Sequence, residues 1–246
     1  MESGYSNYGK YEIDESLELS LPNSMIKIEK IGKNAFSYYR VDSEDNISQK
    51  VIPTTSDKIE IELSPIRPLN HPAKRTNYMY LDFDSPIFLS ENMSATIFAR
   101  CPIEVGLFLV HSGHKDSLDW LTCDPVNSRF GLYGTPESGT LCKYVKSHIV
   151  ESYHDSVPYM NGIVKINLKN ELDSGHSISK FVFPLFEYNL YYKNNEVIFD
   201  TVNVVLKKKA TIETLDVSPL KLETDWTLAP SYERLTISKR LELGVD

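Results

Sequence analysis

The chain has 246 residues, of which 41% are hydrophobic and 24% are charged, and its formal net charge is −8. These are ordinary values for a globular protein, and they exclude a chain that is disordered throughout. The acidic balance also disfavours binding to a nucleic-acid backbone, which requires a basic footprint on the protein.

Membrane, targeting and redox signals point to the cytoplasm. No stretch approaches the roughly eighteen consecutive apolar residues of a membrane-spanning helix, so we expect no transmembrane segment. Residues 1–20 contain neither the basic nor the apolar region of a secretory signal. The cysteines Cys101, Cys123 and Cys142 are an odd number for a disulfide framework. The sequence therefore predicts reduced thiols in a cytoplasmic protein.

Strands dominate the predicted elements, because apolar residues recur with a period of two. In "SMIKIEKIG" (24–32) and "DKIEIELS" (57–64) apolar and polar side chains alternate, which indicates strands with one solvated face. The same pattern predicts strands within 77–85, 94–110, 140–150, 162–170, 179–192 and 196–206. A short helix over 116–122 is the only helical candidate. The prediction is an all-β protein with antiparallel β-sandwich architecture, built as two packed, immunoglobulin-like units.

Connections between the strands suggest how the chain is divided. The segment 64–77 contains three prolines and is expected to cross outside a sheet. The segment 111–128 is expected to be a long loop, of the kind that is often functional. Turn residues cluster at 152–162, so we predict an N-terminal β-sandwich domain at 1–153 and a C-terminal immunoglobulin-like domain at 154–228. Residues 229–246 would form a final strand or arm.

The stretch "RFGLYGTPESGTLCKYVKS" (129–147) raises the possibility of a phosphate-binding loop. Gly134 and Gly139 have the spacing of such a loop, but Thr140 and Leu141 follow where Lys and Ser or Thr are required. A turn between two paired strands is favoured, with Gly139 supplying a positive φ. The alternative is a ligand-binding site at the end of the turn, lined by Tyr133, Glu137 and Tyr144.

Other chemical sites are only weakly indicated. His111, His114 and Asp116 lie close enough in sequence to hold a metal ion, although histidines exposed on a polar loop explain the same pattern. Asp82 and Asp84 share one face of a predicted strand, which is most simply its solvated face. The run Lys207–Lys209 is expected to be a solvated strand end. We expect no catalytic residue and no cofactor.

Three segments together resemble a known family. They are "SPIRPLNHPAKRTNYMYLDFDSPIFL", "ARCPIEVGLFLV" and "RFGLYGTPESGTLCKYVKS", in this order along the chain. The pattern resembles the uncharacterised, mainly archaeal family known as domain of unknown function 432, over roughly residues 8 to 215. The resemblance implies an archaeal, cytoplasmic protein. It implies no activity, so no functional residue is carried over.

Two functional hypotheses follow. The first is a non-enzymatic binding or assembly module that uses edge strands and loop ends against a protein partner or a second copy. The alternative is a small-molecule or metal-binding protein, a hydrolase among the options, with a cleft formed by the loops 64–77, 111–128 and 134–139. The second hypothesis requires these loops to meet at one end of the fold.

Overall fold

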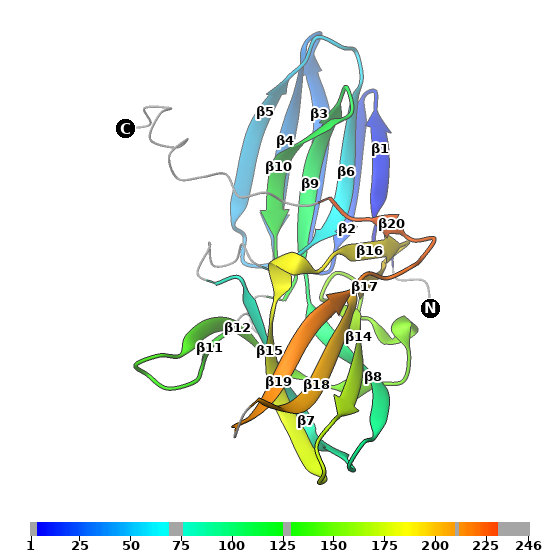
Figure 1. Ribbon diagram of the computed structural model, residues 1–246. Coiled ribbons are helices and arrows are strands. Elements are labelled where there is room, and N and C mark those ends of the chain that lie inside the picture. Colours follow the sequence, from blue (N-terminus) through cyan, green and yellow to red (C-terminus); the bar gives the residue numbers. More distant parts are fainter. Residues whose placement is uncertain (1–3, 69–75, 125–128, 210–211, 231–246) are drawn as a thin grey trace.

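Strands account for almost all regular structure in the computed structural model, which describes residues 4–68, 76–124, 129–209 and 212–230. Within these ranges the helical elements are two single turns of 3-10 helix, η1 (Tyr153–Asp155) and η2 (Leu185–Glu187). The predicted all-β class is therefore confirmed, and the strands form two units stacked along the length of the molecule (Figure 1). No helix in the described residues is long and apolar enough to cross a membrane.

The upper unit in Figure 1 contains two four-stranded sheets whose neighbouring strands are all antiparallel. One sheet has the order β1 (Gly9–Ile13), β6 (Ile59–Ile66), β9 (Glu104–His111) and β10 (His114–Leu121). The other has the order β2 (Ser16–Leu21), β3 (Ser24–Gly32), β4 (Ala35–Asp42) and β5 (Ile47–Pro53). Alternate residues of both sheets, such as Ile28, Phe36, Ile61 and Leu107, are buried in the core, as the period-two pattern predicts.

The lower unit pairs a four-stranded sheet with an eight-stranded one. The smaller sheet has the order β11 (Arg129–Tyr133), β12 (Thr140–Ser147), β7 (Tyr78–Leu89) and β15 (His176–Pro184). The larger has the order β13 (Ile149–Val150), β8 (Ser94–Pro102), β14 (Asn161–Asn170), β17 (Glu196–Phe199), β16 (Leu190–Lys193) and β20 (Thr227–Leu228). Its remaining strands, β18 (Thr201–Lys209) and β19 (Ile212–Leu220), branch from β14.

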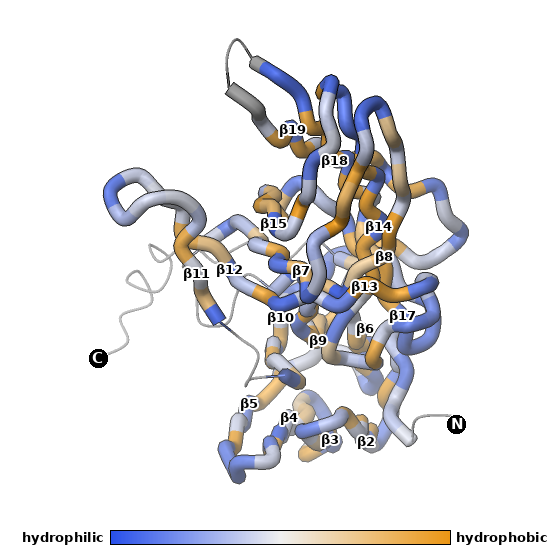
Figure 2. The backbone as a smooth tube through the Cα atoms, turned by 90° about the horizontal axis from the view of Figure 1, so that it is seen from below, coloured by the Kyte–Doolittle hydropathy of each residue, from blue (hydrophilic) through white to orange (hydrophobic). Residues whose placement is uncertain are grey.

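Apolar strands make up the core of the lower unit, and Figure 2 shows long hydrophobic stretches along β14 and β8. Buried side chains come from β7, β15, β14 and β18, among them Leu81, Phe83, Phe181, Phe183, Ile166 and Val204. Three strand pairs are parallel, namely β12 with β7, β14 with β17 and β14 with β18. The sheets are therefore mainly antiparallel, with parallel pairs that the local pattern did not predict.

Two expected elements take a different form. The segment 94–110, expected as one strand, breaks at the buried Ile103, so that β8 belongs to the lower unit and β9 to the upper one. The expected loop 111–128 and helix 116–122 are replaced largely by strand β10. Ser112 and Gly113 have φ values of 48° and 80°, and such a pair forms the tight turn of a two-residue β-hairpin. The polar residues after this turn occupy a solvated edge strand.

The sheets do not separate at the expected boundary between residues 153 and 154. Strand β14 pairs with β8, and β15 pairs with β7, so both lower sheets combine strands from the two sides of this position. The upper unit in turn uses two separate parts of the chain, 9–66 and 104–121. Pairing between distant strands, which a local pattern cannot reveal, decides this division.

Buried polar contacts join the two units. Within the upper unit, Lys115 Nζ on β10 lies 2.7 Å from Glu62 Oε2 on β6, and the almost completely buried Glu62 meets Tyr192 of the lower unit. Burial, and then the neighbouring Glu62, raise the pKa of Tyr192 on β16 to about 12. The backbone N–H of Tyr8 donates to the carbonyl of Asn194 at 3.2 Å. These contacts fix the lower unit against the upper one.

Candidate functional site

Three tyrosines gather on the outer face of the smaller lower sheet. On β7 the side chains of Met79, Leu81 and Phe83 are buried, so the alternate residue Tyr80 faces outward. Its ring centroid lies 5.4 Å from that of Tyr133 and 5.3 Å from that of Tyr144, both in edge-to-face geometry. We call Tyr80, Tyr133 and Tyr144 the tyrosine cluster.

The sequence around the cluster shapes it. Gly131 leaves room for two of the rings, because a Cβ atom at this position would lie 3.3 Å from Tyr144 Cβ and 3.4 Å from the Tyr80 ring. Tyr144 donates its hydroxyl to Asp82 Oδ2 at 2.7 Å. This hydrogen bond, with burial and the carboxylate charge, raises the pKa of Tyr144. The hydroxyl therefore remains a hydrogen-bond donor at neutral pH.

The hairpin of β11 and β12 exposes apolar side chains at a sheet edge. Leu132 and Leu141 lie opposite each other and are 46% and 43% exposed, and Tyr133 is 37% exposed. Successive side chains of a strand point to opposite faces, so the leucine pair and Tyr133 lie on different faces of the hairpin. In Figure 1 this hairpin projects sideways from the lower unit, and β11 is the edge strand of its sheet.

The expected turn between these strands is confirmed, with one correction. Strand β11 pairs with β12 in antiparallel register, from Arg129 opposite Tyr144 to Tyr133 opposite Thr140. The positive φ falls at Gly134, with a value of 108°, and not at Gly139. Gly139 is needed because the backbone is crowded here. Its N–H donates to the carbonyl oxygen of Thr135 at 2.7 Å, and a Cβ atom at position 139 would lie only 2.5 Å from the same oxygen.

We expect Gly139→Ala to lower the free energy of unfolding by about 1–2 kcal/mol, because the backbone oxygen facing the new methyl group must move. Urea denaturation of the variant and the wild type measures this difference. Gly32→Ala is the matched control, since a Cβ atom at Gly32 meets nothing within 4 Å. Equal stabilities of the wild type and the Gly139 variant would contradict the steric role.

The predicted ligand-binding residues come together only in part. Tyr133 and Tyr144 both belong to the tyrosine cluster through their contacts with Tyr80. Glu137 lies on the exposed tip of the turn, beyond the paired strands. Tyr80 was not expected at this site, because it is distant in sequence and reaches the cluster only through the parallel pairing of β7 with β12.

The predicted metal-binding residues lie at the turn between β9 and β10. The ring centroids of His111 and His114 are 6.4 Å apart, and His111 Nδ1 lies 3.6 Å from Asp116 Oδ2. All three side chains are exposed. Within the described ranges no group of three or more His, Cys, Asp or Glu side chains could hold a metal ion. The geometry brings these residues near one another without forming a binding site.

The loops of the alternative hypothesis do not share one end of the fold. The turn between β9 and β10 lies at the upper end of the molecule in Figure 1, whereas the turn between β11 and β12 projects from the lower unit. Of the segment 64–77, residues 69–75 lie outside the described residues. A common cleft of segments 111–128 and 134–139 therefore lacks its geometric basis.

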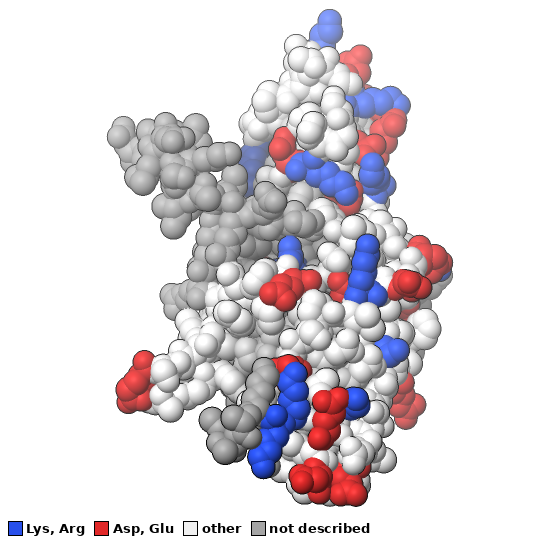
Figure 3. Space-filling model, viewed as in Figure 1, with Lys and Arg blue, Asp and Glu red and all other residues white. Residues whose placement is uncertain are grey.

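The basic run at 207–209 lies at the end of β18. Lys207 forms an ion pair with Asp216 on β19. On the face shown in Figure 3, Lys and Arg side chains are interspersed with Asp and Glu and separated by uncharged areas. This face therefore presents no continuous basic surface.

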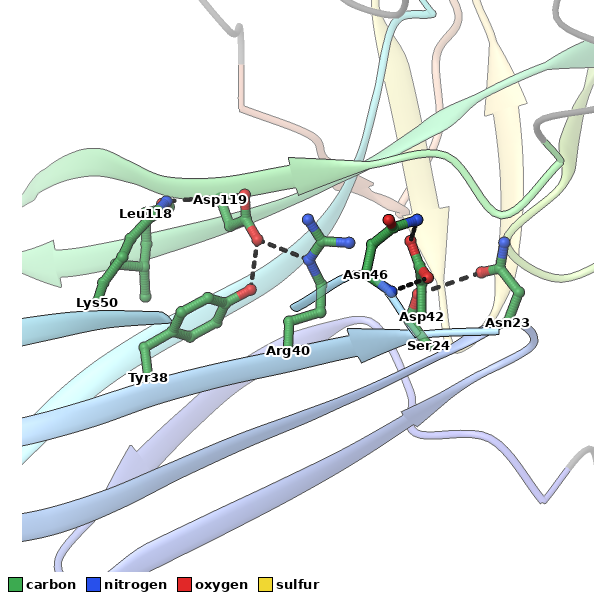
Figure 4. A network of polar contacts seen from close by, with 9 residues as sticks. All are labelled: Asn23, Ser24, Tyr38, Arg40, Asp42, Asn46, Lys50, Leu118 and Asp119. Carbon is green, nitrogen blue, oxygen red and sulfur yellow. Dashed lines mark hydrogen bonds and ion pairs between the residues drawn. The ribbon is translucent and has the colours of Figure 1, made fainter. Parts of the chain in front are cut away.

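A polar network inside the upper unit was missed by sequence reasoning (Figure 4). Asp119 on β10 accepts hydrogen bonds from the Tyr38 hydroxyl at 2.5 Å and from Arg40 Nε at 2.8 Å, both on β4. Lys50 on β5 donates to the carbonyl of Leu118 and lies 3.7 Å from Asp119 Oδ1. The network therefore ties β10 to the neighbouring strands of the facing sheet.

The charges of this network satisfy one another. Burial alone would raise the pKa of Asp119, but the Tyr38 hydrogen bond and the Arg40 and Lys50 charges outweigh it and hold that pKa below its usual value. Asp119 lies where the register of β10 shifts, a local irregularity of the pairing with β9. We assign the network to stability. The sequence hid it because β10 was expected to be a loop.

Comparison with known proteins finds one family. A family model described as "Protein of unknown function (DUF432)" matches residues 7–242. This range contains all the strands named above, so the family model covers both units. No curated protein and no solved structure matches the chain.

Proposed function

The chain belongs to the DUF432 family of proteins of unknown function, and we propose that it is a non-enzymatic binding module for an extended segment of a partner protein. The segment would add as a further strand to the edge of β11. The observation that carries this proposal is the projecting β11–β12 hairpin, which combines an edge strand with exposed apolar side chains on both faces.

Backbone chemistry supports this mode of binding. An edge strand presents a row of N–H and C=O groups that another extended chain can pair with. In such strand addition the main-chain hydrogen bonds supply affinity, and contacts with alternate side chains supply specificity. The hairpin projects from the lower unit, so an added strand would meet few neighbours there.

Side chains of the hairpin indicate what the segment contains. On one face Leu132 would contact an apolar side chain of the added strand. On the other face Tyr133 would contact a second side chain, and the exposed Arg129 favours an acidic residue near the end of β11. The proposed partner segment is therefore extended, apolar on one face and acidic at one end.

The test is site-specific photo-crosslinking in the native host, with a photoreactive amino acid at Leu132. The matched control position is Ile47, which is 60% exposed on β5, the edge strand of an upper sheet. We expect position 132 to crosslink to one extended segment of another protein and position 47 to give no such product. A peptide of that segment then serves as the ligand for affinity measurements.

We expect Leu132→Asp and Tyr133→Ala each to weaken binding of this peptide at least about tenfold, as removal of a central apolar contact does. Ile47→Asp should leave the affinity unchanged. Fluorescence anisotropy with a labelled peptide measures all three. Unchanged affinity in both hairpin variants, or crosslinking of position 132 to a second copy of this chain, would overturn the proposed partner.

The proposal includes a place in the cytoplasm, supported by three free and buried thiols. Burial raises the pKa of Cys123 to about 12 and that of Cys142 to about 11, so both stay protonated at neutral pH. Unreactive thiols without disulfide partners suit a reducing compartment.

A further inference from the structure

A cleft of about 290 Å³ lies beside the tyrosine cluster in the lower unit. Strands β7, β8 and β12 and the first residues of β11 and β14 line it. Its cationic side chains are Arg100, Arg129 and Lys146, and Tyr144 of the cluster forms part of its wall. The cleft therefore has a basic lining next to an aromatic surface.

Backbone pairing places the three cations. Arg129 on β11 lies opposite Tyr144 on β12, and Lys146 is two residues farther along the same face of β12. Arg100 on β8 approaches from the facing sheet. Its Nε–H donates to the carbonyl of Asp155 at 3.1 Å, which restrains the orientation of the guanidinium group. Two sheets thus contribute positive charge to one small volume.

These cations differ from many others in the described part of the chain. Even well-exposed lysines such as Lys10 and Lys58 form ion pairs with carboxylates at 2.6–2.7 Å. Among the described residues, by contrast, the side chains of Arg100, Arg129 and Lys146 form no ion pair with a carboxylate within 4.0 Å.

Two carboxylates also line the cleft, Asp84 and Asp124. The carboxylate of Asp84 contacts Nδ1 of His148, which also lines the cleft. The three cations still outnumber the carboxylates in a protein whose net charge is −8. Like charges held together repel one another, and a bound anion removes that repulsion.

We propose that this cleft binds a phosphoryl group, carried either by a small free anion or by a phosphorylated side chain of a partner. Guanidinium groups match the planar pairs of oxygen atoms that phosphate offers, and a lysine adds a point charge. A dianion with several acceptor oxygens can engage three donors from different strands at once. This inference is independent of strand addition at β11, because the two sites use different groups apart from Arg129.

The test is isothermal titration calorimetry of the full chain with inorganic phosphate, pyrophosphate and a phosphoserine peptide. We expect saturable binding, weakened about tenfold or more in Arg100→Gln and in Lys146→Glu, the scale of a lost charge-assisted hydrogen bond. The control is Lys33→Glu at the exposed turn between β3 and β4, which changes the net charge by the same amount as Lys146→Glu. Circular dichroism confirms that each variant is folded.

The relative affinities of the three probes, and their changes in the variants, distinguish the possible outcomes. Tighter binding of pyrophosphate supports a free anion as the source, and tighter binding of the peptide supports a phosphorylated partner. No saturable binding of any of the three probes overturns the proposal. Equal weakening by Lys33→Glu overturns it as well, because the effect is then general electrostatics. Leu132→Asp should leave the affinity for phosphate unchanged, so this test and that of the proposed partner can fail separately.

Discussion

Glu104→Gln is expected to lower the free energy of unfolding by about 3–5 kcal/mol, the cost of removing one partner of a buried ion pair. Glu104 Oε1 lies 3.6 Å from Lys143 Nζ, and the two side chains are 1% and 5% exposed. Glu104 lies on β9 of the upper unit and Lys143 on β12 of the lower one. The pair therefore joins the two units where water cannot replace the lost carboxylate.

The loss of stability in the Glu104→Gln variant should depend on pH in a defined direction. Burial lowers the pKa of Lys143 from its usual value, and the Glu104 charge opposes this effect. Without the carboxylate the folded-state pKa falls further, so the unfolded chain binds the proton more tightly. The destabilisation should thus be full where Lys143 stays protonated in the folded variant and shrink as the pH rises through the lowered folded-state pKa values, which lie below the ordinary lysine value of ~10.5.

Urea denaturation of the wild type and the variant at pH 7 and pH 9.5 measures both effects. The informative control is the double variant Glu104→Leu with Lys143→Met, which replaces both charges by apolar groups and should recover most of the stability. A Glu104→Gln variant as stable as the wild type at pH 7 would show that the pair contributes little to the joint.

Asp119→Asn is expected to cost about 2–3 kcal/mol, below the cost for a fully buried pair because Arg40 is partly exposed. Its amide cannot balance the positive charges of Arg40 and Lys50. Tyr38 and Arg40 both donate to Oδ2, so an amide oxygen in that place leaves the NH2 group, in place of Oδ1, facing the Lys50 ammonium group. The edge of the upper unit, where β10 faces β4 and β5, should open first.

At low pH the stabilising effect of Asp119 should be lost. The folded-state pKa of Asp119 is lowered, so its contribution is present above the unfolded value of ~3.9 and is lost as the pH falls through the lower folded value. Wild type and Asp119→Asn should therefore converge in stability as the pH falls below about 4. Thermal unfolding at pH 7 and pH 3 tests this convergence.

The matched control is Asp116→Asn on the same strand, where the carboxylate is exposed and its neighbour is His111. A substitution of this kind usually changes stability by no more than about 0.5 kcal/mol. If Asp116→Asn and Asp119→Asn lower the stability equally, then the loss comes from replacing any aspartate of this strand by asparagine, and the network of Asp119 is not its cause.

Local patterns predicted much of the secondary structure. Strand β3 coincides with the expected 24–32, since alternation of "SMIKIEKIG" depends only on neighbouring residues. The turns near 134–139 and 192–197 were also predicted, and Asn194 has the positive φ of 54° that such turns require. Segment 111–128 was misread because its polar edge strand lacks the apolar alternation of a buried one.

The candidate sites likewise combine residues whose arrangement local sequence predicts with residues that only the strand pairing brings together. Tyr133 and Tyr144 belong to one hairpin and share one of its faces, which the turn between them allows to be predicted. Tyr80 joins them only because β7 pairs in parallel with β12. The basic cleft takes Arg100 from the facing sheet, and no spacing along the chain links Arg100 to Lys146.

The sequence by itself determined the all-β class, most strand positions and the tight turns, because side-chain alternation and turn chemistry act between near neighbours. The tertiary structure alone decided the division into two units, since it depends on a break at Ile103 and on pairing across residue 153. It also decided which polar groups meet: Tyr38 and Asp119 are 81 residues apart, yet they share a hydrogen bond. Burial makes such distant contacts strong, and burial is a property of the packed sheets.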